Sequence, residues 1–422
     1  MDSTAPIINQ VTTLSLPAYQ SSRLPNGMEL FSLPGGSEPV LKMELVFRAG
    51  ASKEKKIAVA EFMAGQLSEG TQQLSSADFA EKIEFLGATL QTRGGVDTIR
   101  IKLYTLSRFF PQLIELIRDI ILYPSFDEQE LKVYTNNKIE RLQIELKKND
   151  VLAYRHLTEA IYGKEHPYGR NALPQDYQAI TVEDMVEHHR QFILPQNGMI
   201  FLSGSYDEEI LESVKRVLGT WGTLNENGSG KETVHVAKSQ TGYIEIDGPQ
   251  SHQAAIRIGR KLFTQDHPDW NGLYVLNTIL GGYFGSRLMT EIRENLGLTY
   301  GIYSGMDSFA EDGCFYISTE TTTENIKTVI EAIKIEAAKL KQTLIPEPEL
   351  RMARNYLMGH LMTQLDGPFA TLDFIKSMKI ERLPDETFSD LVNTIQQITS
   401  NELRELAIRY LDLDQWVTIV IK

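Results

Sequence analysis

The stretch "EFLGATLQ" at residues 84–91 has a counterpart in the same chain, "ENLGLTYG" at residues 294–301, at an offset of 210 residues. Two further blocks recur in the same order at offsets of 219 and 218 residues: "FDEQELKVYTNNKIERL" (126–142) with "IPEPELRMARNYLMGHL" (345–361), and "RQFILPQNGMIFLSG" (190–204) with "IRYLDLDQWVTIVIK" (408–422). Three blocks in one order at a nearly constant offset indicate an internal duplication. We therefore predict two domains of about 200 residues that share one fold.

The two copies are separated by a segment with the composition of a loop. Residues 222–240, "GTLNENGSGKETVHVAKSQ", are rich in Gly, Asn, Ser and charged residues and have no apolar period. This composition is typical of an exposed linker. The expected organisation is an N-terminal domain over residues 1–221, a linker over 222–240 and a C-terminal domain over 241–422, in a chain of 422 residues that is too long for one ordinary core.

Strand and helix patterns alternate inside each copy. The hairpin and strand signals are an Asn-Gly pair between apolar runs and period-two alternation, in "RLPNGMELFSL" (23–33), "VLKMELVFRAG" (40–50) and "DTIRIKLYTL" (97–106). Helical apolar spacing marks "SRFFPQLIELIRDIILYP" (107–124), "DEQELKVYTNNKIERLQIELKK" (127–148) and "TTENIKTVIEAIKIEAAKLKQ" (322–342). The fold class predicted from these patterns is α+β, with a largely antiparallel sheet covered by helices in each domain.

Composition excludes some classes of protein. With 42 Lys and Arg against 56 Asp and Glu, the formal charge of −14 argues against a nucleic-acid binder. The single cysteine, Cys314, lies in an apolar alternation, so we predict a buried core thiol, with no intrachain disulfide and no thiolate metal cluster. The N-terminal residues have no basic-then-apolar signal pattern, and no run is long enough to span a bilayer. We expect a cytoplasmic protein, or a periplasmic one if a signal was trimmed.

Two segments carry a resemblance to a known family. The two-copy layout, with "GGYFGSRLMTEIRENLGLTYGIYS" (281–304) and "YGKEHPYGR" (162–170), resembles the pitrilysin/insulinase-type zinc peptidases over nearly the whole chain. The resemblance implies a LuxS/pitrilysin-like metallopeptidase fold. Members of the family carry an inverted HxxEH helix, on which two histidines bind zinc and the glutamate is the general base. A carboxylate from a later helix completes that site.

The matching helix in this chain lacks those residues. The family pattern reads like "AHFLEHMLFKGT", whereas residues 60–71 read "AEFMAGQLSEGT". Glu61 replaces the first histidine, Ala64 the general base and Gly65 the second histidine. The distal carboxylate should fall near residues 140–145, where the nearest candidates are Glu140, Gln143 and Glu145. We therefore expect no zinc in this chain and a packing role for the helix, with these residues facing inward: Ile57, Val59, Phe62, Met63 and Leu67.

The second copy matches the family where the first copy does not. In the family an Arg and a Tyr, seven residues apart, bind substrate and stabilise the oxyanion, and Arg293 and Tyr300 have that spacing. The equivalent residues of the first copy are Ile83 and Leu90. Spacing alone leaves another interpretation open, in which Arg293 pairs with a neighbouring acid (Glu291 or Glu294) and Tyr300 packs at the domain edge.

Other polar and glycine positions have less specific signals. Gly281, Gly282 and Gly285 lack the preceding strand and the lysine of a phosphate loop, so the resemblance favours contact with a peptide substrate. His188 and His189 are adjacent on a predicted helix and point in different directions, as surface or packing residues do. His166, in "HPYGR", is expected to shape a turn.

The resemblance implies a function in a pair of chains. Some family members consist of one HxxEH subunit and one homologous zinc-free subunit that supplies the Arg and Tyr. We predict that this chain is such a zinc-free subunit, inactive alone, with zinc only in its partner and a peptide or small protein as substrate. A homodimer when the partner is absent stays open. The alternatives are a non-enzymatic structural or assembly protein derived from the family and, less favoured, a self-sufficient zinc endopeptidase.

Overall fold

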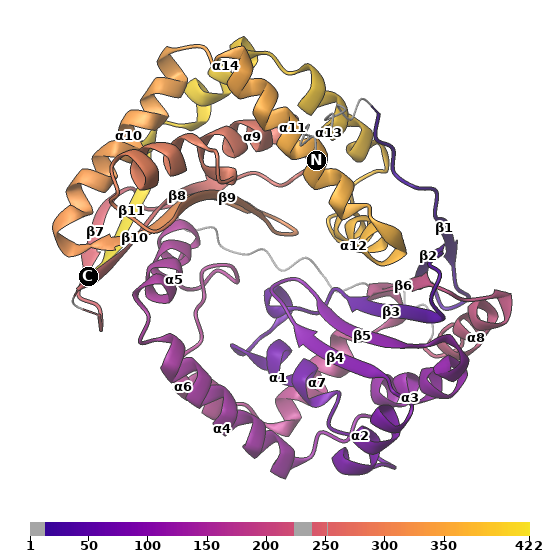
Figure 1. Cartoon of the computed structure of the whole chain (residues 1–422). Coiled ribbons are helices and arrows are strands. Elements are labelled where there is room, and N and C mark those ends of the chain that lie inside the picture. The colour runs from indigo at the N-terminus through magenta and orange to yellow at the C-terminus, as the bar shows by residue number, and fades with distance from the viewer. Residues whose placement is uncertain (1–12, 223–238, 251) are drawn as a thin grey trace, which may run out of the picture. The chain divides into compact units, whose positions relative to one another are not determined.

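The computed structural model describes residues 13–222, 239–250 and 252–422 (Figure 1). Most of the predicted linker, residues 223–238, lies outside the described residues. The chain divides into two compact units. The first consists of residues 18–239 together with 367–376, and the second of residues 240–366 and 377–422 with the described residues before Ala18.

The first unit contains a six-stranded sheet. Its strands are β1 (Gln20–Arg23), β2 (Glu29–Pro34), β3 (Val40–Phe47), β4 (Thr89–Gly94), β5 (Ile99–Leu106) and β6 (Gly198–Gly204). They lie in the order β1-β2-β6-β3-β5-β4, and every pair is antiparallel except β2 with β6. The hairpin predicted at the Asn-Gly pair is confirmed, because β1 pairs with β2 from Arg23 opposite Glu29 onward.

The second unit repeats this sheet with five strands. These are β7 (Gly242–Ile246), β8 (Gln253–Leu262), β9 (Ile302–Ser308), β10 (Gly313–Thr322) and β11 (Val417–Ile421). Their order, β7-β11-β8-β10-β9, is that of β2-β6-β3-β5-β4, and again only the first pair is parallel. Both copies also end a helical segment on a left-handed glycine, Gly87 at φ 61° and Gly297 at φ 63°. The predicted duplication and the α+β class are confirmed.

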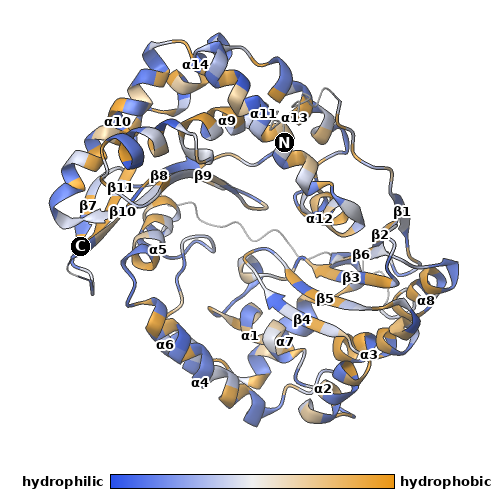
Figure 2. Ribbon diagram, viewed as in Figure 1, coloured by the Kyte–Doolittle hydropathy of each residue, from blue (hydrophilic) through white to orange (hydrophobic). Residues whose placement is uncertain are grey.

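Helices pack against both sheets. The first unit has α1 (Val59–Gln66), α2 (Ser76–Phe85), α3 (Phe110–Leu122), α4 (Glu128–Glu145), α5 (Asn149–Tyr162), α6 (Pro174–Gln178), α7 (Val182–Phe192) and α8 (Glu208–Leu218). The rest of the chain has α9 (Trp270–Asn277), α10 (Ile326–Gln342), α11 (Glu347–Gln364), α12 (Gly367–Ile380), α13 (Glu386–Gln397) and α14 (Ser400–Tyr410). In the first unit, apolar residues of β3 and β5 form one core with α1, α3 and α8, and Figure 2 shows that β4 at the sheet edge is more hydrophilic.

The first part of α12 belongs to the first unit through buried ion pairs. Lys376 bonds Glu44 of β3 at 2.6 Å, and Lys42 bonds Asp373 at 2.8 Å. Lys42 is 1% exposed and Glu44 is fully buried. Burial lowers the pKa of Lys42, although Asp373 opposes that shift. Because unpaired buried charges are costly, these pairs hold residues 367–376 on the sheet.

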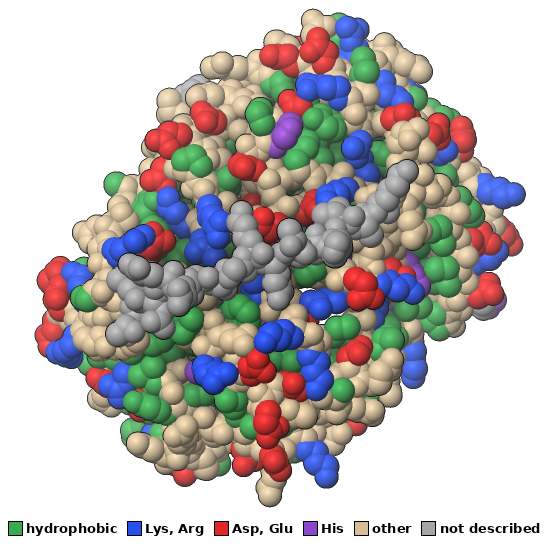
Figure 3. Space-filling view, turned by 180° about the vertical axis from the view of Figure 1, so that it is seen from behind, with side chains coloured by type: hydrophobic (Ala, Val, Ile, Leu, Met, Phe, Trp, Pro, Cys, Tyr) green, Lys and Arg blue, Asp and Glu red, His purple; other side chains and the backbone are tan. Residues whose placement is uncertain are grey.

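The surface and the helices limit which partners are plausible. On the face shown in Figure 3, acidic and basic side chains are interspersed, so the charge of −14 is not gathered into one patch there. None of the helices in the described parts of the chain combines the length and apolarity that a bilayer crossing needs. Cys314 is fully buried on β10, as predicted.

Candidate functional site

The helix at the degenerate motif is a packing helix. On α1 and just after it, Val59, Phe62, Met63 and Leu67 are buried, and Ile57 is partly buried, as predicted. The N-terminal end of α1 is capped by a buried carboxylate, since Glu54 accepts the backbone N–H groups of Ala58 at 2.9 Å and Ala60 at 3.1 Å. Burial raises the pKa of Glu54, and the two backbone bonds oppose that shift.

The "HPYGR" segment supports this helix. Arg170 donates to the carbonyl oxygen of Ala51 at 3.0 Å and lies 3.9 Å from the Glu54 carboxylate. His166 shapes a turn, as expected: its Nδ1 accepts the backbone N–H of Tyr168 at 3.1 Å. The "HPYGR" segment therefore meets the degenerate-motif helix at the start of α1.

Glu61 is engaged by a cation from the chain itself. Lys138 of α4 donates to Glu61 Oε1 in a very short ion pair, and the Tyr177 hydroxyl lies 3.4 Å from Glu61 Oε2. Burial alone would lower the pKa of Lys138, but its hydrogen bond and attraction to Glu61 leave that pKa raised. The lysine therefore stays protonated and neutralises the carboxylate that corresponds to the first zinc ligand.

An aromatic ring fills the space beside Gly65. A Cβ atom built on Gly65 would lie 2.3 Å from both Cζ and the hydroxyl oxygen of Tyr134. This ring packs edge-on against Phe62 at 5.1 Å, and the Lys138 ammonium lies 5.2 Å from its centroid. Burial raises the pKa of the Tyr134 phenol, so it is neutral at physiological pH. The space of the second ligand is therefore occupied by side chain, and Ala64 beside it is fully buried.

These side chains do not fit a zinc ion. Zinc sites use thiolate, imidazole or carboxylate donors, whereas the surroundings of Glu61 supply an ammonium and two neutral phenols. On α4, Glu140 and Gln143 lie on the exposed side, and Glu145 pairs with Lys148 at 2.8 Å. Nowhere in residues 13–222, 239–250 and 252–422 do three or more His, Cys, Asp or Glu side chains gather so as to hold a metal ion. No catalytic step through zinc is derived from this chain.

Arg293 and Tyr300 lie together in the second unit. Arg293 is in a short π-helix, Met289–Asn295, and its Nε donates to the backbone oxygen of Tyr300 at 3.0 Å. Its guanidinium lies 4.8 Å from the ring centroid of Phe284 and forms no salt bridge within the described residues. The Tyr300 side chain is 100% exposed, and its hydroxyl has no partner in the described part of the chain. Pairing of Arg293 with Glu291 or Glu294, and packing of Tyr300, are therefore not what the structure shows.

Threonine side chains hold the backbone next to Tyr300. The Thr299 hydroxyl donates to the backbone oxygen of Glu320 at 2.7 Å and accepts from Thr319 at 2.9 Å. Thr321 donates to the backbone oxygen of Leu298 at 2.7 Å. The loop is therefore attached to β10, and the Tyr300 ring projects from it into solvent. These hydrogen bonds hold the backbone from which the phenol side chain extends.

Comparison with known proteins finds similarity to M16 peptidases. Residues 179–357, from before α7 into α11, match the family model described as "Peptidase M16 inactive domain". The chain is similar in sequence to the M16 peptidases. It is 23% identical over 358 residues to "Uncharacterized zinc protease YmxG" of Bacillus subtilis, covering 83% of this chain and 84% of that protein. It is 24% identical over 374 residues to "Non-peptidase homolog YmxG" of Helicobacter pylori, covering 87% and 85%.

Solved structures confirm the M16 fold. A structure described as the peptidase M16 inactive domain from Pseudomonas fluorescens has a TM-score of 0.83 at 23% identity, over 96% of this chain and 98% of that one. A structure described as a protease from Helicobacter pylori has a TM-score of 0.87 at 18% identity, over 96% and 100%. At these identities the similarity establishes the fold, in agreement with the pitrilysin-type resemblance.

The three candidate glycines differ in their surroundings. Gly281 is buried, and a Cβ there would lie 2.6 Å from the backbone nitrogen of Ser304, so its size is explained by close packing on β9. Gly282 is partly exposed and Gly285 is exposed. Contact with a peptide, if made through these glycines, is therefore left to Gly282 and Gly285.

Several residues around the site were not found by comparing motifs. Lys138, Tyr134 and Tyr177 fill the surroundings of Glu61, and the signal available was the four-residue spacing of Tyr134 and Lys138 on one predicted helix. His188 and His189 are packing residues: each Nε2 lies 2.8 Å from a backbone oxygen, that of Ala49 and Ile121 respectively.

Proposed function

We propose that this chain is the zinc-free subunit of a two-chain M16 peptidase. In this proposal it binds the substrate peptide and supplies Arg293 and Tyr300 to an active site whose HxxEH helix and zinc come from a homologous subunit. The observation that carries the proposal is the presentation of this pair: Arg293 is bonded to the Tyr300 backbone, and the phenol is fully exposed on a fixed loop.

The chemistry of the two side chains supports this role. A guanidinium without an acidic partner and a phenol without a hydrogen-bond partner are donors that remain available for a substrate. In peptide hydrolysis, negative charge develops on the carbonyl oxygen, and donors already in position stabilise it without reorganising. Arg293 is further held by the Phe284 ring, at 4.8 Å from its centroid. The pair therefore suits oxyanion stabilisation or binding of a peptide carbonyl.

The rest of the site supports a partner. The side chains around Glu61 do not fit zinc, so the metal and general base have to come from another chain. The substrate proposed is an extended peptide or small protein. Exposed Gly285 would let its backbone approach the loop, and an unpaired sheet edge such as β4 would accept an added strand.

The test is reconstitution with an HxxEH homologue from the same genome. The chain alone should contain no stoichiometric zinc and should hydrolyse no peptide. The mixture of the two chains should contain zinc and hydrolyse peptides. In the mixture, Arg293→Ala and Tyr300→Phe should each lower kcat by about 10²–10³-fold with a smaller effect on KM, because a donor to the oxyanion acts in the transition state.

Matched substitutions away from the pair provide the controls. Arg351→Ala on α11 and Tyr243→Phe on β7 also remove an exposed guanidinium or phenol oxygen in the second unit, and both should leave kcat unchanged. Unchanged kcat in the Arg293 and Tyr300 variants would refute their role. Stoichiometric zinc that is lost on Glu61→Ala would refute the zinc-free assignment. Copurification in a non-peptidase assembly, without an HxxEH chain, would favour the structural alternative.

A further inference from the structure

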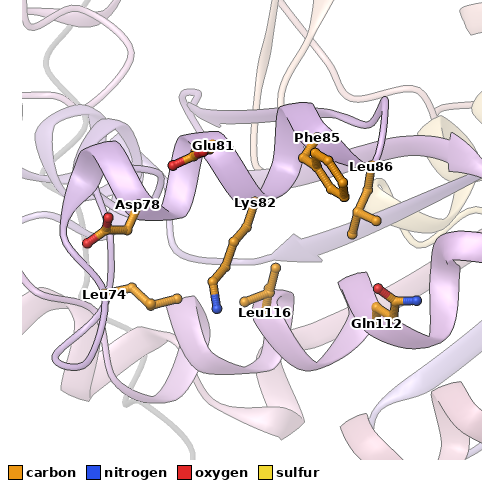
Figure 4. A pocket seen from close by; sticks show the side chains of 8 residues that line it. All are labelled: Leu74, Asp78, Glu81, Lys82, Phe85, Leu86, Gln112 and Leu116. Carbon is orange, nitrogen blue, oxygen red and sulfur yellow. The ribbon is translucent and has the colours of Figure 1, made fainter.

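A groove between α2 and α3 in the first unit is not used by the proposed function. The α2–α3 groove has a volume of about 540 Å³ and is lined by Leu74, Asp78, Glu81, Lys82, Phe85, Leu86, Gln112 and Leu116 (Figure 4). All of these residues lie in the continuous described segment 13–222 and within one unit.

The groove exists because α2 packs through only one side. Phe79 and Ile83 are buried, whereas Phe85, at the end of the same helix, is 86% exposed. No other large hydrophobic residue described in the first unit is as exposed as Phe85. Leu74, Leu86 and Leu116 are half-buried and form an apolar floor between the two helices (Figure 4). A large exposed aromatic residue beside such a floor is typical of an interaction site.

Charge is distributed unevenly along the groove. Asp78 and Glu81 lie one turn apart toward the start of α2, and Phe85 and Leu86 lie at the other end (Figure 4). Lys82 extends from α2 toward α3 between these ends (Figure 4). Neither Glu81 nor Lys82 forms a salt bridge within the described residues. With Glu84 also exposed on α2, acids outnumber bases on this helix by three to one. The groove therefore has an acidic end and an aromatic end.

We propose that the α2–α3 groove docks an amphipathic helix of a partner protein. An apolar stripe on that helix would cover Phe85 and Leu116, and a Lys or Arg would face Asp78 and Glu81. Two helices form the walls of the groove. Their backbone N–H and C=O groups are hydrogen-bonded within each helix, so they cannot pair with an added β-strand. A third helix can pack along them at the usual interaxial distance of about 8–10 Å.

Charge also decides against a second copy of this chain as the occupant. A two-fold contact places the same patch on both sides, so α2 would meet α2. Each copy of α2 carries three acids and one base, so the contact would join two surfaces of the same net charge, which is unfavourable. A basic, apolar-striped helix from a different protein avoids this repulsion. This inference stands independently of the Arg293 and Tyr300 role.

The experiment uses the full chain and a displayed library of helical peptides of roughly four turns, long enough to span α3. Selection on the unmodified protein should enrich peptides with apolar residues at i, i+3 or i+4 and i+7 and a basic residue at one end. Binding of an enriched peptide should weaken about tenfold or more in Phe85→Ser, because exposed aromatic anchors dominate such interfaces. Reversal of the acids in an Asp78→Lys, Glu81→Lys variant should favour peptides with an acidic end.

The control is Val133→Ser, which removes an apolar side chain that is 56% exposed on α4 and should leave peptide binding unchanged. Circular dichroism of each variant confirms folding. Enriched peptides without the apolar and basic pattern, or equal binding to Phe85→Ser, would overturn the proposal. It is also overturned if the protein self-associates and Phe85→Ser abolishes that association, since the occupant is then a second copy.

Discussion

Residues 83–90 and 293–300 occupy the same place in two copies of one fold, yet their side chains lie in opposite environments. Ile83 is buried and Leu90 packs against the core of the first unit. Arg293 is only partly buried, and Tyr300 is fully exposed. Both segments turn at a left-handed glycine, although Ile83 lies on an α-helix and Arg293 on a π-helix. The same turn therefore belongs to the core in one copy and to the exposed surface in the other, and the residues at its two ends differ accordingly.

The polar groups near the motif helix also differ from those of the second unit. In the first unit the polar groups around Glu61 satisfy one another, since Lys138 and Tyr177 both contact its carboxylate. In the second unit Arg293 forms no salt bridge and the Tyr300 hydroxyl has no partner within the described residues. We therefore call the first copy closed, because its polar groups are bonded to one another, and the second copy open, because the two side chains of its pair are not. The following predictions test this contrast, beginning with the largest expected effect.

Exchange of the residues at the first end of the turn should destabilise the first unit much more than the second. Ile83→Arg places an unpaired cation where the native side chain is buried, and the free energy of unfolding should fall by about 3–5 kcal/mol. The reverse change, Arg293→Ile, removes one hydrogen bond at a partly exposed position and should cost about 1 kcal/mol or less. Urea unfolding of both variants gives the comparison.

Glu84→Arg is the control for the exchange, because residue 84 is adjacent to Ile83 but exposed. It adds the same cation without burying it and should change stability by no more than about 0.5 kcal/mol. If Ile83→Arg is tolerated equally well, the first copy is not closed at this turn and the contrast fails.

The closed state at Gly65 predicts opposite effects of adding a methyl group in the two units. Gly65→Ala should destabilise by about 1–3 kcal/mol, because the new Cβ would overlap the Tyr134 ring. Gly359→Ala on α11, where an added Cβ meets no atom within 4 Å, should stabilise by about 0.5–1 kcal/mol. Thermal unfolding of the two variants measures both effects.

A second substitution identifies the cause. Tyr134→Ala removes the overlapping ring, so the added cost of Gly65→Ala should largely disappear in that background. An unchanged cost would mean that the ring does not define the space beside Gly65, and the argument against a ligand at this position would weaken.

Mild acid should destabilise the first unit through its two packed histidines. Burial lowers the pKa of both His188 and His189 from the ordinary value of 6.5. Above pH 6.5 the rings are neutral whether the chain is folded or unfolded. The contribution of the two neutral histidines to the free energy of unfolding is then fully present. As the pH falls below 6.5 the unfolded chain takes up protons first, and stability is lost until the lowered folded pKa is passed.

The check is urea unfolding between pH 7 and pH 5 for the native chain and for His189→Gln, which keeps an N–H donor toward Ile121. The slope of stability against pH should be shallower in the variant. Equal slopes would show that His189 titrates alike in the folded and unfolded chain.

The sequence predicted the repeated fold well, because the signals are periodic and local. The strands over 40–47 and 99–106 and the helices over 110–122 and 128–145 agree with the expected patterns. The identical strand order of the two units follows from the three repeated blocks. The domain range that ended at residue 422 gave no indication that residues 367–376 group with the first unit. That grouping depends on the pairing of Lys376 with Glu44, between residues far apart in sequence.

The candidate site was predictable only in part. The spacing of Arg293 and Tyr300 located the pair, but the bond from Arg293 to the Tyr300 backbone depends on how the π-helix ends. At the degenerate motif the sequence indicated which ligands are missing and could not indicate what replaces them. Tyr134 and Lys138 lie on a helix more than 60 residues further along the chain, and their side chains meet α1 only after folding.

The filling of the space around α1 also constrains how this lineage can change. A histidine introduced at Gly65 meets Tyr134, and a glutamate at Ala64 enters a fully buried position with no metal to neutralise it. Removal of Lys138 alone leaves Glu61 without its cation. Each single step back toward a zinc site is unfavourable before the others are present. The packing around α1 therefore opposes the stepwise introduction of an HxxEH motif into this chain.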